Sequence, residues 1–95
     1  MGKYSLNKTP QDVLHDLASK VKVLRKEQNL TKPELAKKSG VSIGRLRRFE
    51  QSGQISLASL LKILNVLGRL NDMEGILTSH HQKNIEKFFS DKTRK

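Results

Sequence analysis

A chain of 95 residues with a formal net charge of +10 has room for one small domain whose surface carries a large positive excess. It contains no cysteine, so no disulfide reinforces its core, and we expect a reducing, cytoplasmic location. No apolar run is long enough to span a bilayer, and the first ten residues lack the apolar stretch of a secretory signal. We therefore expect neither a membrane protein nor a secreted one.

The first predicted helix begins after Thr9, because threonine caps helices and proline, here Pro10, is favoured at the first helical position. We expect it to end near Asn29. One face of this helix carries four apolar side chains at three- and four-residue spacing: Leu14, Leu17, Val21 and Leu24. No segment of the chain shows the strict alternation of a strand, so the chain is predicted to be all-α.

The second and third predicted helices are short and lie close together. Thr31 and Glu34 have the spacing of a capping box, which predicts a helix that starts there and ends at Gly40. Ser42 is a natural N-cap for the next helix, predicted from Ile43 to about Gln51 and closed by Gly53. The side chains expected to face the core of this pair, including the hinge residue between the helices, are Leu35, Ala36, Val41, Leu46 and Phe49.

A fourth helix is predicted between the cap Ser56 and Gly68. Its apolar residues cover a wide arc, which is typical of a largely buried helix: Leu57, Leu60, Leu61, Ile63, Leu64 and Leu67. A short fifth helix is predicted from Asp72 to Leu77. We divide the chain into an arm (1–8), a domain (9–79) and a basic extension (80–95) that is either a sixth helix or a frayed tail.

The positive charge lies within the folded part as well as in the tail. From residue 20 to residue 48 there are ten lysines and arginines and only two glutamates, a net charge of +8. Such an excess in a small domain favours a polyanionic partner. The alternative interpretation is a solvated basic surface with no specific partner.

Residues 32–51 satisfy several constraints of two helices joined by a tight turn. Ala36 is small enough for close helix packing, Gly40 permits a sharp corner, and Leu46 faces the shared core. Over about residues 24–67 the chain resembles the Cro/C1-type helix-turn-helix domain, also called the XRE family. The resemblance is carried by the stretch TKPELAKKSGVSIGRLRRFEQSGQISLASLLKILNVLG. The resemblance implies an all-α, five-helix, lambda-repressor-like bundle that binds an inverted repeat, usually as a homodimer, and often represses its own operon.

Within that family, RRFEQSGQISLASLLKIL followed by a short closing helix resembles antitoxins of the HipB kind. This narrower resemblance adds a HipA-like toxin to the partners to be tested. The expected function is therefore sequence-specific binding of a near-palindromic operator in double-stranded DNA and transcriptional repression at the nucleoid. The expected alternative is a docking module that neutralises a toxin or an enzyme, with DNA binding secondary.

The resemblance places the start of the third helix at base edges in the major groove. The expected base-reading residues are Ser42, Ile43, Gly44, Arg45 and Arg48. Arg45 and Arg48 are three residues apart and share a face, and arginine can bond guanine through O6 and N7. Ile43 is suited to a thymine methyl group. For Gly44, close approach to DNA and neutral drift in an exposed first turn stay open.

The expected phosphate contacts come from Lys32, where the family usually has glutamine, and from four residues of the third helix and its end: Arg47, Gln51, Ser52 and Gln54. For Arg47, as for Lys37 and Lys38, a solvated charge is the alternative. By resemblance, Arg25 and Glu50 form a structural ion pair that fixes the third helix against the first.

Other classes of function find little support. Asp12, His15 and Asp16 share a helix face but are interpreted as a solvated stripe, and adjacent His80 and His81 point apart, so no metal or other cofactor is expected. No nucleophile or phosphate-loop motif indicates an enzyme. Four aromatic residues are few for a protein that stacks on single strands or RNA. Ile85, Phe88 and Phe89 form an apolar stripe that either packs on the domain, crosses a dimer, or docks a partner.

Overall fold

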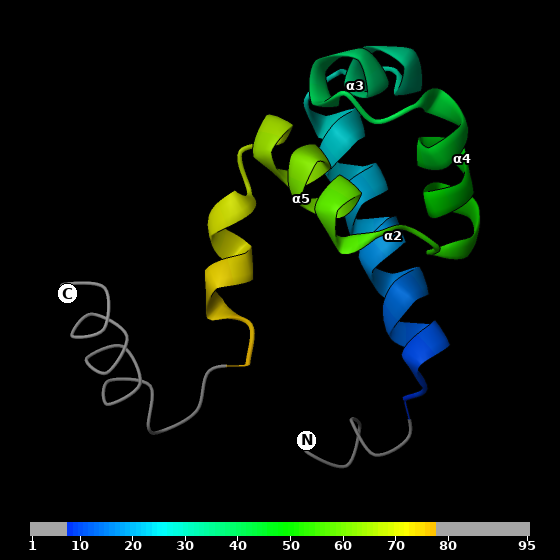
Figure 1. Cartoon of the computed structure of the whole chain (residues 1–95), viewed down its shortest axis with the longest axis vertical. Coiled ribbons are helices and arrows are strands. Elements are labelled where there is room, and N and C mark those ends of the chain that lie inside the picture. Colours follow the sequence, from blue (N-terminus) through cyan, green and yellow to red (C-terminus); the bar gives the residue numbers. More distant parts are fainter. Residues whose placement is uncertain (1–7, 78–95) are drawn as a thin grey trace, which may run out of the picture.

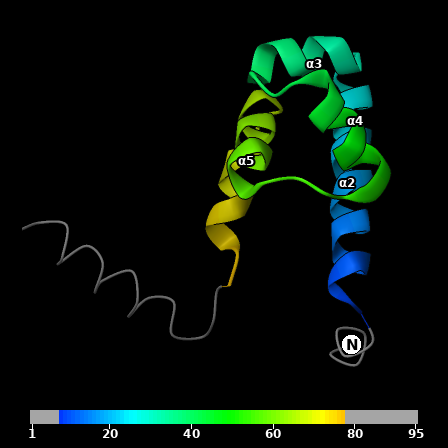
Figure 2. The same ribbon diagram turned by 45° about the vertical axis from the view of Figure 1, so that its right-hand side comes forward.

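The structure, a computed structural model, describes residues 8–77 as five helical elements: α2 (Pro10–Glu27), α3 (Lys32–Ser39), α4 (Ile43–Ser52), α5 (Leu57–Val66) and the 3-10 helix η1 (Leu70–Gly75). Within this range there is no strand, so the predicted all-α bundle is confirmed. The long α2 lies between α4 on one side and η1 on the other (Figure 1). Turned by 45°, α3 spans the gap between α2 and α5 (Figure 2).

Each α-helix begins at the capping residue that the sequence predicts. The Thr9 hydroxyl accepts from the Asp12 N–H at 3.1 Å, and the Asp12 carboxylate accepts from the Thr9 N–H at 3.1 Å, which is a complete capping box. A second complete capping box joins Thr31 and Glu34 at the start of α3, the first helix of the predicted pair. The hydroxyls of two serines cap the remaining α-helices: Ser42 for α4 and Ser56 for α5.

Glycine ends both α3 and α4, for a different reason in each helix. Gly40 ends α3 with φ +79° and turns the chain toward α4, although a side chain there would meet nothing within 4 Å. Gly53 ends α4 with φ +81°, and a Cβ added to it would lie 2.7 Å from the Leu14 Cβ. The end of α4 therefore packs directly onto the backbone and side chain of α2.

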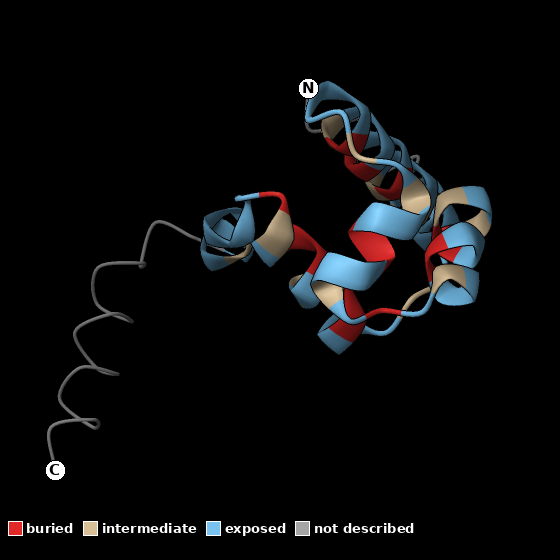
Figure 3. Ribbon diagram, turned by 90° about the horizontal axis from the view of Figure 1, so that it is seen from above, coloured by how far each residue is buried: buried red, intermediate tan, exposed pale blue. Residues whose placement is uncertain are grey.

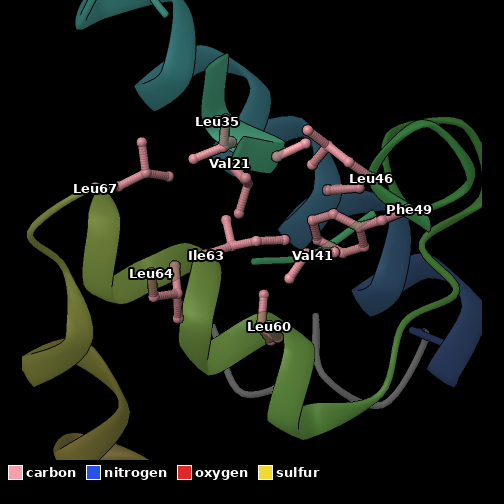
Figure 4. Packing of buried hydrophobic residues seen from close by; sticks show 11 residues of the cluster. Val21, Leu35, Val41, Leu46, Phe49, Leu60, Ile63, Leu64 and Leu67 are labelled. Atoms are coloured by element: carbon pink, nitrogen blue, oxygen red, sulfur yellow. The ribbon is translucent and has the colours of Figure 1, made fainter. Parts of the chain in front are cut away.

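The core lies where α2, α3, α4 and α5 converge. Phe49 points toward Val41, Leu46 and Ile63 at the centre of the cluster (Figure 4), and Leu35, Leu46, Phe49 and Ile63 are each 0% exposed. Buried residues face inward on every α-helix, and the outer faces are exposed (Figure 3). The complete set of buried apolar residues is Ala18, Val21, Leu35, Ala36, Val41, Leu46, Phe49, Leu60, Ile63, Leu64 and Leu67.

Two expectations about the second half of the domain are wrong. Leu57 is 61% exposed, because it occupies the first position of α5, one turn before Leu60, the first core residue of that helix. The predicted short fifth helix is present, but it is a 3-10 helix that runs from Leu70 to Gly75 and so begins and ends two residues before the expected range from Asp72 to Leu77. Six residues without a side-chain cap are too few to stabilise an α-helix in isolation, and Leu77 itself is 94% exposed.

Within the described residues no helix is both long enough and apolar enough to cross a bilayer. The expectations for residues 80–95, including Ile85, Phe88 and Phe89, lie outside the described range, as do most residues of the expected arm. The domain boundaries at residues 8 and 79 stay predictions.

Candidate nucleic-acid interface

A three-residue turn sets the angle between α3 and α4. The Gly40 N–H donates to the Ala36 carbonyl at 2.9 Å, and the Val41 N–H donates to the Ser39 hydroxyl at 3.2 Å. Val41 is 3% exposed and fills the corner between the two helices. The orientation of α4 is therefore fixed by local hydrogen bonds and by a buried side chain, both of which the sequence pattern supplies.

The start of α4 contains three predicted base-reading residues in different environments. The Ser42 hydroxyl accepts from the Arg45 N–H at 3.2 Å, and its proton can still be donated outward. Ile43 is half-buried and packs against the core cluster, so only part of its side chain faces out. Gly44 is exposed, and a Cβ there would meet nothing within 4 Å, so packing inside the protein does not require glycine at this position.

Arg45 and Arg48 lie together at the edge of an open hollow of about 400 Å³. Both residues are exposed. The other lining residues are Gln54, Ile55 and Ser56, in the connection from α4 to α5, and Ser59 in the first turn of α5. The structure thus brings Gln54, predicted as a phosphate contact, next to the two arginines. Sequence reasoning missed Ile55, Ser56 and Ser59 as part of this surface; their position directly after the Gly53 turn was the only available signal.

The remaining predicted phosphate contacts are spread around α4. Arg47 and Gln51 are exposed, and Arg47 lies about 100° around the helix from Arg48 and about 200° from Arg45. Ser52 is engaged within the protein: its hydroxyl donates to the Arg48 carbonyl at 2.8 Å and accepts from the Gln54 N–H at 3.3 Å. Ser52 therefore shapes the corner that carries Gln54.

A buried ion pair connects α4 to α2. The Arg25 guanidinium donates to Glu50 through Nε at 2.9 Å and through Nη2 at 3.2 Å, and its Nη1 donates to the Leu30 carbonyl at 2.8 Å. The two side chains are only 7% and 2% exposed. Lys32 Nζ lies 4.0 Å from the second oxygen of Glu50, with its side chain 35% exposed. The network thus joins α2, α3 and α4.

Both acidic residues within residues 31–54, Glu34 and Glu50, have hydrogen-bond partners inside the protein. Glu50 is held by Arg25, as described above. The Thr31 backbone N–H donates to the Glu34 carboxylate at 2.8 Å, and the Thr31 hydroxyl accepts from the Glu34 backbone N–H at 3.2 Å. Hydrogen bonding by Thr31, first of all by its backbone N–H, holds the pKa of the Glu34 carboxyl below its ordinary value. Six cationic side chains in the same range leave this surface strongly positive: Lys32, Lys37, Lys38, Arg45, Arg47 and Arg48.

The polar stripe of α2 is engaged in local interactions. Asp12 accepts the capping bond from Thr9, and Asp16 pairs with Lys8. That hydrogen-bonded pairing lowers the pKa of Asp16 and raises the pKa of Lys8. No group of three histidine, aspartate or glutamate side chains within residues 8–77 is arranged to hold a metal ion. His80 and His81 lie outside that range.

Comparison with known proteins gives one match. A family model described as helix-turn-helix matches residues 21–70, which is just over half of the chain. The matched range runs from the middle of α2 to the start of η1 and includes every residue that the sequence assigns to base or phosphate contact. Searches of curated proteins and of solved structures each found no match.

Proposed function

Because the chain belongs to the Cro/C1-type helix-turn-helix (XRE) family of DNA-binding transcription regulators, we propose that it represses transcription by binding a near-palindromic operator as a homodimer. We place its action at the nucleoid and include its own operon among its targets. The observation that carries the proposal is that Arg45 and Arg48 are both exposed and lie side by side on the face of α4 next to the hollow.

In the proposed complex the first two turns of α4 enter the major groove. Arg45 and Arg48 reach base edges, where each arginine that bonds a guanine at O6 and N7 adds about 1–3 kcal/mol of discrimination. The exposed backbone at Gly44 lets the helix approach the bases closely, and the outward part of Ile43 meets a thymine methyl group. Ser42 donates its hydroxyl proton at the same end of the helix.

The remaining cations and amides hold the domain on the backbone. Lys32 at the start of α3, Arg47, Gln51, Gln54 and the corner formed by Ser52 lie around the reading residues and are assigned to phosphates. A single domain offers few base contacts, so specificity calls for two. Two reading helices about 34 Å apart meet successive major grooves on one side of the duplex, and two-fold symmetry then makes the operator a near-palindrome.

Selection of bound sequences from a random duplex pool tests this assignment. We expect the parent protein to enrich two inverted half-sites about one helical turn apart. Arg48→Ala should lose the preference at one or more base pairs in each half-site, whereas Arg47→Ala, which removes the same charge from another side of α4, should weaken all sequences similarly. Lys32→Ala should behave like Arg47→Ala. If Arg48→Ala enriched the parent's sequence unchanged, the reading face would be wrongly assigned.

The salt dependence of binding tests the phosphate contacts separately. The logarithm of the association constant should fall with the logarithm of salt concentration, with a slope of about −0.9 for each phosphate neutralised. Removing one phosphate contact should reduce that slope by about one. Binding that does not change between low and moderate salt would contradict the electrostatic part of the proposal.

A second candidate function is neutralisation of a HipA-like toxin. Large apolar side chains that are exposed outside α4, among them Val23 on α2 and Ile76 after η1, favour a protein partner. The test is to mix the purified chain with the product of the neighbouring gene. A stable complex that inhibits that product would support an antitoxin, and the absence of a kinase-like toxin beside the gene would remove this candidate.

A further inference from the structure

An apolar groove is lined by residues of α2, the end of α5 and η1. Its volume is about 570 Å³, and its apolar wall is formed by Leu17, Val21, Val23, Leu24, Leu64 and Met73. Val23 is 53% exposed, although it stands directly on the groove. The groove shares no lining residue with the hollow beside Arg45 and Arg48. It is therefore a separate surface from the DNA-reading face.

The 3-10 helix that forms one wall of the groove packs on the core through Met73 but is otherwise only loosely covered by the described residues. No residue of η1 is buried, and Met73 is only half-buried. Three large apolar side chains at this end of the domain are exposed: Leu70 at 40%, Ile76 at 51% and Leu77 at 94%. These three do not line the groove, but they lie in or directly after η1, which forms one of its walls, and clustered exposed apolar side chains often mark an interaction surface.

We propose that the groove is the docking site of the chain's own C-terminal segment, residues 85–89, which packs there within the same molecule. Ile85, Phe88 and Phe89 have the i, i+3, i+4 spacing that puts three large apolar side chains on one helix face. Two of the three phenylalanines of the chain are in this segment; the third, Phe49, is in the core. A face of this kind fits an apolar groove.

The length of chain beyond the described residues suits this occupant. The described residues end at Leu77, four residues after Met73 on the groove wall. Seven residues lie between Leu77 and Ile85, and the eight residue steps from one to the other reach up to about 26–29 Å when extended. The segment can therefore reverse direction and return to the groove. A covalent tether of this length also gives the segment an effective concentration in the millimolar range, which favours docking within one molecule over docking on a second copy.

The charges favour the same site. Residues 80–95 contain five lysines and arginines and two acidic residues. The end of α2 and η1 carry Glu27, Asp72 and Glu74, and the first two line the groove. Lys20 and Arg69 also line it, and Arg69 Nη2 is paired with the Asp72 carboxylate at 2.7 Å, so the charges of the groove lining balance. Residues 31–54, in contrast, carry six cations against two glutamates, so a basic segment is repelled less at the groove than at the reading face.

The inference does not depend on DNA binding, and a spin label tests it directly. The chain has no cysteine, so Lys92→Cys gives a single attachment point for a nitroxide just beyond Phe89. In the full-length protein, free of DNA, we expect the label to broaden the methyl signals of Val23, Leu24 and Met73. The methyl signals of Ile43, at the start of α4, should stay sharp.

Two variants on the same helix provide the control. Val23→Asp places a charge on the groove wall, whereas Val13→Asp places the same charge at a position of α2 with almost equal exposure, 52% against 53%, outside the groove lining. We expect Val23→Asp to abolish the broadening and Val13→Asp to retain it. Substituting Phe88 and Phe89 together by serine should also abolish it.

Three outcomes would overturn the proposal. One is the absence of broadening in the labelled parent protein. A second is broadening that appears only between a labelled chain and a separate isotope-labelled chain, which would assign the groove to a second copy. The third is broadening that persists unchanged in both Val23→Asp and the double serine variant. In each case the DNA selection described above still reports on α4 independently.

Discussion

Replacing Glu50 by glutamine removes the negative charge of the buried pair while keeping the size and shape of the side chain. Arg25, whose side chain is 7% exposed, would then keep its bond to the Leu30 carbonyl but face a neutral amide in place of a carboxylate. Breaking a buried ion pair from one side leaves an uncompensated charge and costs about 3–5 kcal/mol. Because the amide oxygen can still accept one bond from Arg25, we expect a loss near 3 kcal/mol, the lower end of about 3–5 kcal/mol.

A loss of this size is a large part of the stability of a small domain, which totals about 5–15 kcal/mol. For a domain of this length each kcal/mol moves the Tm by about 4–8 °C, so the Tm should fall by about 12–24 °C. Circular dichroism during heating measures it. Glu74→Gln is the matched control, because Glu74 is exposed on η1 and the change in net charge is the same. We expect its effect on stability to stay within about 0.5 kcal/mol.

DNA affinity at a temperature where both variants are folded distinguishes positioning from simple electrostatics. If only net charge mattered, both variants would bind DNA more tightly than the parent protein. If Glu50 orients α4, Glu50→Gln should bind the selected operator more weakly than Glu74→Gln does. An unchanged Tm in Glu50→Gln would refute the structural role of the pair, and equal affinities would refute its role in positioning.

Two further expectations follow from the backbone and the caps. In urea denaturation Gly53→Ala should destabilise the domain by more than Gly68→Ala. Both glycines have a left-handed φ, which costs an alanine about 1–2 kcal/mol. Only at Gly53 does the new Cβ fall 2.7 Å from the Leu14 Cβ, and this overpacking costs about 1–3 kcal/mol more. Equal losses would contradict the close approach of α4 to α2. The lowered pKa of Glu34 stabilises the fold above the ordinary carboxyl pKa of 4.5, and this contribution is lost as the pH falls through the lowered folded value. The stability difference between the parent protein and Glu34→Gln should therefore shrink below pH 4.5, and a pH-independent difference would argue against the Thr31 bonds as its cause.

The starts of the helices were predictable because capping is local. Thr9, Thr31, Ser42 and Ser56 each bond a backbone N–H three residues further on, so each cap is contained within a few letters of sequence. The buried faces of α3 and α4 followed from helical spacing for the same reason. Leu57 shows the limit of this reasoning, because spacing gives the face of a residue but not whether the core extends to that turn of the helix.

Apart from the Arg25–Glu50 pair, which the family resemblance supplied, contacts between distant segments were not predictable from the sequence. The Gln11 amide donates to the Ser52 carbonyl at 2.8 Å and the Gln28 amide donates to the Leu67 carbonyl at 2.9 Å, across 41 and 39 residues respectively. Neither glutamine stands in a pattern that distinguishes it from a solvated side chain. The same limit explains why Gln54 was not placed beside the arginines, since its position depends on the direction of the chain after Gly53.

The Arg25–Glu50 pair explains how a carboxylate can lie beneath the positively charged surface that we propose contacts phosphates. An unpaired carboxylate at the base of α4 would repel the DNA backbone in a region of low dielectric constant, where the repulsion is strong. In the structure Arg25 binds both carboxylate oxygens, and Lys32 Nζ approaches one of them at 4.0 Å. Two cations thus surround one anion, and the network carries a net charge of +1 at the point where α2, α3 and α4 meet. The pair can therefore lock the reading helix without reversing the sign of the field that draws DNA to it.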